Sequence, residues 1–191
     1  MSRDPFDLTT ALTRLVADLS ARLPAFAHID PARLLVTITP ARNRGPFGLQ
    51  ARCTPLRLRD GAATKKLRGR LYQVQRYTLD GRELLYLVTF VVPRFLDLPF
   101  REKLVTVVHE LYHVGERFDG DLRRHPGRCY AHTGSKWNYD AAMGRLVAEY
   151  LATGPNPTLV EWLKPDAAGL AALFGGAVGV TVPRPKLVPV G

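Results

Sequence analysis

The stretch His109–His113 constrains this chain more than any other, because it reads His-Glu-Leu-Tyr-His, a complete HExxH motif. The motif needs a helix, since the i and i+4 spacing then puts both imidazoles on one face, where they can share a metal ion beside Glu110. Apolar residues of the same period precede and overlap it, namely Leu104, Val107, Val108 and Leu111. The sequence therefore predicts a largely buried helix that begins near Asp97-Leu98-Pro99 and carries the motif.

Before this helix, hydrophobic patterning predicts one helix and several strands. Apolar spacings of three and four predict an amphipathic helix over residues 6–23. Residues 34–39 and, less regularly, residues 48–59 are β-prone, and Pro55 favours an edge or a bend in the second run.

Two further β-prone runs, residues 71–79 and 82–92, are joined by Asp80-Gly81, a dipeptide suited to a type I′ hairpin turn. The second run is apolar on both faces, so we expect it inside the sheet. After the motif, a long helix is predicted to end at Gly154-Pro155, followed by a short helix over 158–164 and an extended tail over 182–189.

Composition indicates a globular protein, with 191 residues of which 46% are hydrophobic and 23% charged. Two distant cysteines, Cys53 and Cys129, give no disulfide framework and favour a reducing compartment. The start has an acid and a proline where a signal peptide would be apolar, and residues 170–182 are too short and glycine-rich for a membrane anchor. A cytoplasmic location without a membrane partner is the expectation.

Positive charge is concentrated in one segment of the chain. The formal net charge is +10, and residues 42–70 contain nine basic residues and one acid, Asp60. This segment is either a solvated arginine-rich face or a patch that binds a polyanion such as nucleic acid. Phe47 is its one aromatic residue, which argues against base stacking on single strands. The basic residues are Arg42, Arg44, Arg52, Arg57, Arg59, Lys65, Lys66, Arg68 and Arg70.

An HExxH helix is typical of a catalytic zinc ion (Zn²⁺) with three protein ligands and an open position for water. His109 and His113 would supply two ligands, and Glu110 would take the proton of the attacking water. Four residues are candidates for the third ligand: Asp119, Glu149, His125 and His132.

Sequence context separates these four candidates. Asp119 has the spacing of proteases that need a glycine at position 116, where this chain has Glu116. Glu149 lies further from the motif than a second-helix ligand is expected to lie, and His125 precedes a Pro-Gly turn signal in a basic loop. His132 is preferred because a residue just ahead of a helix has a fixed direction.

These residues carry a resemblance to known proteins. The motif, followed by residues 118–124, Gly127-Arg128 and His132, resembles the phage-type metallopeptidases with HExxH, and more distantly the SprT-like metalloproteases. In the latter a histidine, a glycine and an aromatic follow the motif, as His132, Gly134 and Trp137 do here. The resemblance covers most of residues 1–152, with further matches at Ile29-Asp30, Ala41-Arg42-Asn43 and Pro55-Leu56-Arg57. The chain departs from the SprT-like pattern in Thr133 and in lacking a four-cysteine zinc ribbon.

The resemblance implies a zincin-like α+β domain over residues 1–155, in which a small mixed or antiparallel sheet packs on the HExxH helix and a second long helix. Residues 156–191 would be a partly irregular C-terminal extension. It further implies a zinc-dependent metallopeptidase in which His109, His113 and His132 hold the metal and Glu110 is the base. The strand at 71–79 would pair with a protein or peptide substrate.

An oxyanion stabiliser would come from Arg128, Tyr130 or Tyr139, whereas Cys129 is interpreted as a small buried residue. Two other functions stay open at this point. One is a nucleic-acid-binding protein with a structural zinc site, and the other is a catalytically silent zincin-derived interaction module. The sequence does not indicate an oligomeric state.

Overall fold

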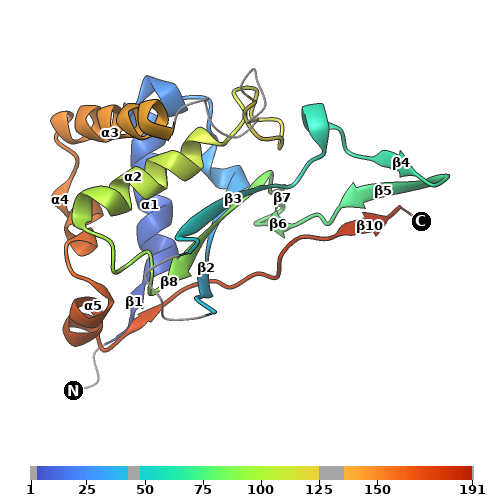
Figure 1. The fold of residues 1–191 in the computed structure, drawn as a ribbon. Helices are drawn as coiled ribbons and strands as arrows, with labels where there is room; N and C mark the ends of the chain where they lie inside the picture. Colours follow the sequence, from blue (N-terminus) through green and yellow to red (C-terminus); the bar gives the residue numbers. More distant parts are fainter. Residues whose placement is uncertain (1–3, 43–47, 125–135, 191) are drawn as a thin grey trace.

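A computed structural model of the chain describes residues 4–42, 48–124 and 136–190, and these form a mixed α+β fold (Figure 1). The main sheet has three strands in the order β2 (Leu34–Pro40), β8 (Tyr86–Val92) and β3 (Ala51–Pro55). β2 runs parallel to β8 and β3 runs antiparallel to it, with Val36 and Cys53 both opposite Val88. The strands predicted over 34–39 and within 48–59 are therefore confirmed.

The central place of β8 follows from its composition. Tyr86, Val88 and Phe90 face the main hydrophobic core, whereas Leu87, on the opposite face, belongs to a smaller cluster. A central strand with apolar contacts on both faces is favoured by a nearly continuous apolar run, which in β8 is interrupted only by Thr89. The prediction that it lies inside the sheet is confirmed.

Helices cover one face of the main sheet (Figure 1). α1 (Leu8–Arg22) begins at Asp7, whose carboxylate accepts a hydrogen bond from the Thr10 N–H at 3.0 Å. α2 (Phe100–Tyr112) carries the HExxH motif, and α3 (Lys136–Ala152) packs against it. All three helices were predicted. Residues 105–108 of α2 are all β-branched and have low helix propensity, and burial of Val107 and Val108 explains why they are helical here.

Segments beyond residue 155 add to the same core. They are α4 (Pro157–Val160), the 3₁₀ turn η4 (Glu161–Leu163) and α5 (Ala167–Phe174). Val160, Trp162 and Leu170 are buried in the main hydrophobic core, to which α1 and α2 also contribute. The domain boundary at residue 155 stays a prediction. Further 3₁₀ turns are η1 (Pro24–Phe26), η2 (Pro31–Arg33) and η3 (Arg59–Gly61).

The predicted hairpin is present but short. Asp80 and Gly81 both have positive φ, 50° and 74°, as a type I′ turn requires. β6 (Thr78–Leu79) and β7 (Arg82–Glu83) pair across it, and the Leu84 N–H donates to the Tyr77 carbonyl at 2.9 Å. The rest of the 71–79 run cannot extend along β8, because β2 and β3 occupy both edges of that strand.

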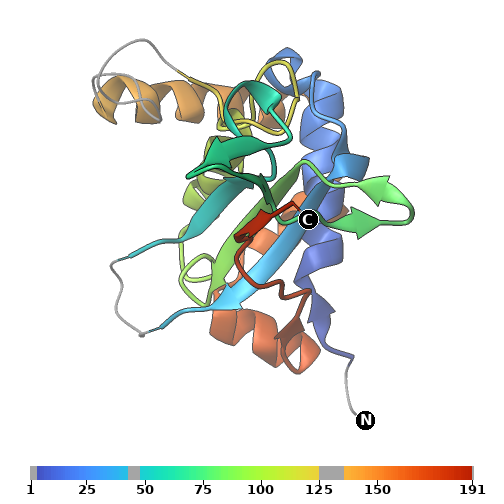
Figure 2. The same ribbon diagram turned by 90° about the vertical axis from the view of Figure 1, so that its right-hand side faces the viewer.

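The earlier part of that run instead forms β5 (Arg70–Val74), which pairs with β4 (Lys65–Leu67) and with β10 (Leu187–Pro189) at the end of the tail. This small sheet projects away from the helices (Figure 1). The tail leaves α5 through β9 (Ala177–Val178), which pairs with β1 (Phe6–Asp7), and passes in front of the main sheet in Figure 2. Its extended course was predicted. In the described ranges, none of the helices has both the length and the apolar character needed to cross a membrane.

Candidate metal centre

The two histidines of the motif lie together at the C-terminal end of α2. Their ring centroids are 4.7 Å apart and the ring planes meet at 74°. Both residues are half-buried, and His113 follows the last residue of the helix as its C-cap. The helix therefore brings the two imidazoles onto one face, as the i and i+4 spacing predicts.

Glu110, between them in sequence, is buried, with 7% of its surface exposed. One carboxylate oxygen, Oε2, accepts a hydrogen bond of 2.6 Å from the Cys53 N–H of β3. Burial raises the pKa of this carboxyl to about 7, although the Cys53 N–H and the positive charge of Arg52 act to lower it. A carboxyl with a pKa near 7 can accept and release a proton at neutral pH.

The Cys53 N–H belongs to an open edge of the main sheet. In β3 and its flanks, the Val91 N–H donates to the Gln50 carbonyl and the Leu56 N–H to the Leu85 carbonyl. Main-chain groups of an antiparallel strand alternate in direction, so those of Ala51 and Cys53 point away from β8. Among the described residues no strand pairs with this edge. Glu110 therefore lies at a free strand edge.

The strand beside the site is β3, whereas residues 71–79 were expected to pair with a substrate there. Residues 71–79 lie in the projecting sheet and in the short hairpin, whereas β3 lies against α2. Pro55 and the arginines of the 48–59 run made that strand look irregular in sequence. Pro55 was also the available signal, because proline is confined to positions where a strand has no partner.

The loop after the motif folds back on itself. The Arg123 N–H donates to the His113 carbonyl at 2.8 Å, and the Gly115 N–H donates to the Asp121 carbonyl at 3.1 Å. The buried Tyr86 hydroxyl donates to the same Asp121 carbonyl at 2.7 Å and accepts from the Gly120 N–H at 3.0 Å. The Tyr86 side chain thus fixes this loop to β8.

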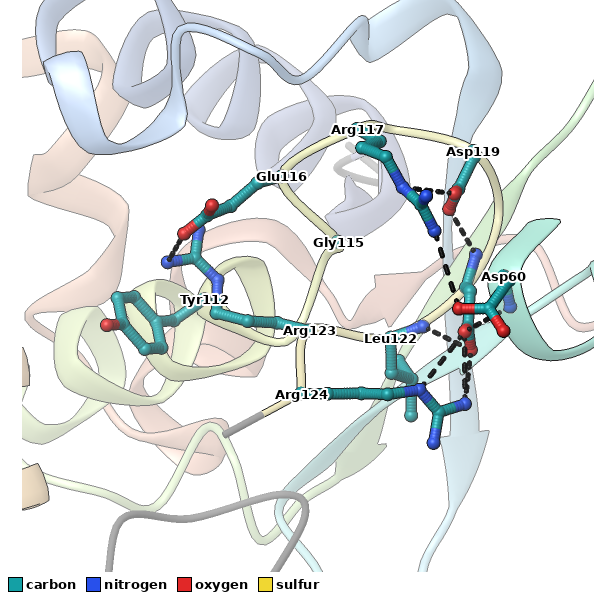
Figure 3. A pocket seen from close by; sticks show the side chains of 10 residues that line it. Asp60, Tyr112, Gly115, Glu116, Arg117, Asp119, Leu122, Arg123 and Arg124 are labelled. Carbon is teal, nitrogen blue, oxygen red and sulfur yellow. Dashed lines mark hydrogen bonds and ion pairs between the residues drawn. The ribbon is translucent and has the colours of Figure 1, made fainter. Parts of the chain in front are cut away.

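A pocket of about 430 Å³ opens beside this loop (Figure 3). The Asp121 carboxylate accepts hydrogen bonds from the Asp60 and Leu122 N–H groups, both at 2.8 Å, and from the Arg124 guanidinium. Arg123 lies 4.2 Å above the centre of the Tyr112 ring. Most charges of this pocket are therefore used to hold the loop together.

Asp119, a candidate for the third metal ligand, lies in the same pocket and pairs with Arg117 at 3.0 Å. Glu149 is exposed on α3. Within the described ranges, no three His, Cys, Asp or Glu side chains form a group that could hold a metal ion. Neither carboxylate is thus brought to the histidine pair.

Two candidates for the third ligand remain, both histidines. His125 and the preferred ligand His132 lie outside the described residues, as do Arg128, Cys129 and Tyr130. Tyr139 is in the first turn of α3, but its side chain is outside the described part of the structure. The third ligand and the oxyanion stabiliser therefore stay predictions.

Comparisons with protein-family models, curated proteins and solved structures find no match for this chain. The described part of the site consists of two adjacent imidazoles and a buried carboxyl on one helix, next to the edge of an antiparallel strand that is unpaired among the described residues.

Proposed function

We propose that this protein is a zinc-dependent peptidase with a zincin-like fold. The observation that carries the proposal is the position of Glu110, which is buried beside the histidine pair and hydrogen-bonded to the free edge of β3. A surface helix with two chance histidines would leave the intervening glutamate in water, where its charge costs nothing. Burial of an ionisable side chain next to a polar pair is instead typical of a site with a chemical role.

The donor set fits zinc. Two imidazoles from adjacent turns and one more protein ligand are common at catalytic zinc ions, with one position left open. His109 and His113 would be two ligands and His132 the proposed third. Bound there, zinc would act as a Lewis acid on the carbonyl of the scissile peptide bond.

Glu110 would be the general base. It would take a proton from the attacking water and pass it to the leaving amine. The Cys53 N–H fixes one oxygen of the carboxylate, so the group has a defined direction before the substrate arrives. Without a bound metal, burial raises the pKa of this carboxyl to about 7, which favours uptake of a proton from water.

The substrate main chain would add to the free edge of β3 as an extra strand. Ala51 directs its main-chain groups and Cys53 directs its carbonyl toward this edge, while the Cys53 N–H is held by Glu110. Pairing there would hold an extended peptide close to the carboxylate. We therefore propose β3, and not residues 71–79, as the strand that pairs with the substrate, because β3 is the strand that reaches Glu110.

Metal content and peptide cleavage test the proposal together. Wild-type protein should contain about one zinc ion per chain and cleave members of a mixed peptide library followed by mass spectrometry. Chelation should stop cleavage and added zinc should restore it. His113→Ala should lose the metal, and His132→Ala should weaken its binding if His132 is the third ligand.

Glu110→Gln separates catalysis from a structural zinc site. This variant should keep zinc and lose cleavage, because glutamine cannot accept the proton. Cleavage at the wild-type rate would contradict the mechanism. Zinc binding with no cleavage by wild-type protein across a broad library would favour the alternatives, a structural zinc site or a catalytically silent module.

A further inference from the structure

A groove of about 910 Å³ lies on the face of the main sheet that the helices leave open. Its floor is made by residues of the three strands, among them Arg52 and Thr89, whose neighbours in sequence face the helices, and Thr39. One wall is the tail from Thr181 to Pro185. Figure 2 shows the tail in front of the sheet.

Four arginines from separate parts of the chain line this groove: Arg42, Arg52, Arg94 and Arg184. Among the described residues that line it there is no aspartate or glutamate. Threonines at 39, 54, 89 and 181 add hydroxyl groups. A concave surface with this lining attracts ligands that have several anionic oxygens.

Arg52 gives a more specific indication. The Nε atom of Arg52 is buried, and this atom has no hydrogen-bond partner within the described residues. A buried donor without an acceptor is costly, roughly 1–3 kcal/mol, so such groups are rare unless a ligand or water completes them. An anionic oxygen in the groove would supply that acceptor.

The structure also divides the basic segment that the sequence analysis singled out. Arg57 pairs with Glu83 at 2.6 Å, and Arg59 lies 3.6 Å from Asp60, so these charges are partly neutralised. Arg42 and Arg52 line the groove instead. Four more basic residues, Lys65, Lys66, Arg68 and Arg70, are exposed on the β4–β5 hairpin of the projecting sheet.

The tail connects the groove to that hairpin. Arg184 lines the groove, and two residues later the Lys186 carbonyl accepts a hydrogen bond of 2.8 Å from the Gln75 N–H, just before β10 joins β5. The positively charged surface thus continues past the groove onto the small sheet, and it is longer than a single small anion. A long polyanion fits this arrangement better than a single small ligand.

We propose that this arginine groove binds the phosphate backbone of a nucleic acid. The described lining contains no aromatic residue, so bases are not expected to stack there and binding should be independent of sequence. Arginine forks match phosphate oxygens, and threonine hydroxyls donate to them. The groove lies on the opposite face of the sheet from α2, and the proposal does not depend on the zinc site.

Fluorescence anisotropy with a labelled DNA strand of about 20 nucleotides, single-stranded and as a duplex, tests the proposal at roughly 50–200 mM salt. Arg42→Gln/Arg184→Gln removes two exposed groove charges. Arg14→Gln/Arg145→Gln removes two exposed charges from α1 and α3, and is the matched control. Thermal unfolding should show that both double variants are as stable as wild type.

The groove variant should bind at least about tenfold more weakly, and its log affinity should fall with log salt less steeply by about one for each arginine removed. The control should change affinity less than about twofold. The form that binds more tightly identifies the preferred nucleic acid. Glu110→Gln should bind as wild type does, so this proposal can fail without the peptidase proposal failing.

Equal losses in the two double variants would overturn the proposal, because they would show binding by net charge alone. No binding at the lowest salt would overturn it as well. Poly-glutamate that binds more tightly than DNA, and is sensitive to the same two arginines, would assign the groove to an acidic protein partner instead.

Discussion

The two faces of the main sheet are made by alternate residues of the same strands, yet they hold charge in opposite ways. On the helix face, Glu110 is buried against β3 and the pKa of its carboxyl is raised to about 7. On the open face, arginines gather in a groove that is lined by no acid in the described part of the chain. The first face buries a carboxyl beside the histidine pair, and the second collects arginines around an open groove.

β3 shows how closely the two faces are connected. Cys53 faces the core and donates its N–H to Glu110, whereas the next residue back, Arg52, lines the groove. The charge of Arg52 still acts on Glu110, since it lowers the pKa of that carboxyl against the larger effect of burial. The period of two along a strand therefore lets adjacent residues serve different surfaces.

The largest expected effect comes from testing one variant of each face in both the cleavage assay and the DNA-binding assay. Glu110→Gln should reduce peptide cleavage by about 10²–10⁴-fold, the usual contribution of a general base, and leave DNA binding unchanged. Arg42→Gln/Arg184→Gln should do the reverse. Cleavage and anisotropy assays on both variants check this. If either variant lost both activities while remaining folded, the two faces would not be separate sites.

A change of pH should distinguish the buried carboxyl from the groove. The folded-state pKa of Glu110 is about 7 and its ordinary value is 4.5, so the folded protein binds the extra proton between these pH values. The stability that the bound proton gives the folded protein is complete below the ordinary pKa. It is lost as pH rises through the folded-state pKa, which lowers the free energy of unfolding by an amount on the order of 3 kcal/mol.

Urea unfolding of metal-free protein at about pH 5 and about pH 8 measures this loss. Glu110→Gln should lack that part of the pH dependence, and the groove variant should keep it. Identical curves for Glu110→Gln and wild type would show that the carboxyl is solvated in the metal-free protein.

The smallest expected effect compares two hydroxyl groups of β8. Tyr86→Phe removes a buried hydroxyl with two partners, the Asp121 carbonyl and the Gly120 N–H, and should cost about 1–3 kcal/mol in the free energy of unfolding. Thr89→Val, on the groove face, removes one hydrogen bond to the Thr37 hydroxyl and should cost about 0.5–1.5 kcal/mol. Denaturant unfolding gives both values, and a larger loss for Thr89→Val would reverse the ranking of the two faces.

Local patterns predicted the elements well and their partners poorly. The HExxH spacing, the apolar run of β8 and the Asp80-Gly81 turn each depend on residues close in sequence, and each is present. Residues 71–79 were expected to pair with a substrate near the site, but β3 is the strand that reaches Glu110, and both edges of β8 are paired with other strands. Which strands pair is decided by contacts between distant segments, and periodicity contains no information on them.

The sequence by itself determined that two histidines and a glutamate share one helical turn, since helix geometry alone places them. It also determined that positive charge exceeds negative charge by ten. Only the tertiary structure decided that Glu110 is buried against the Cys53 N–H and that Arg42, Arg52, Arg94 and Arg184 meet in one groove. Burial and charge clustering depend on elements far apart in the chain, and these come together only when the sheet and the tail are assembled.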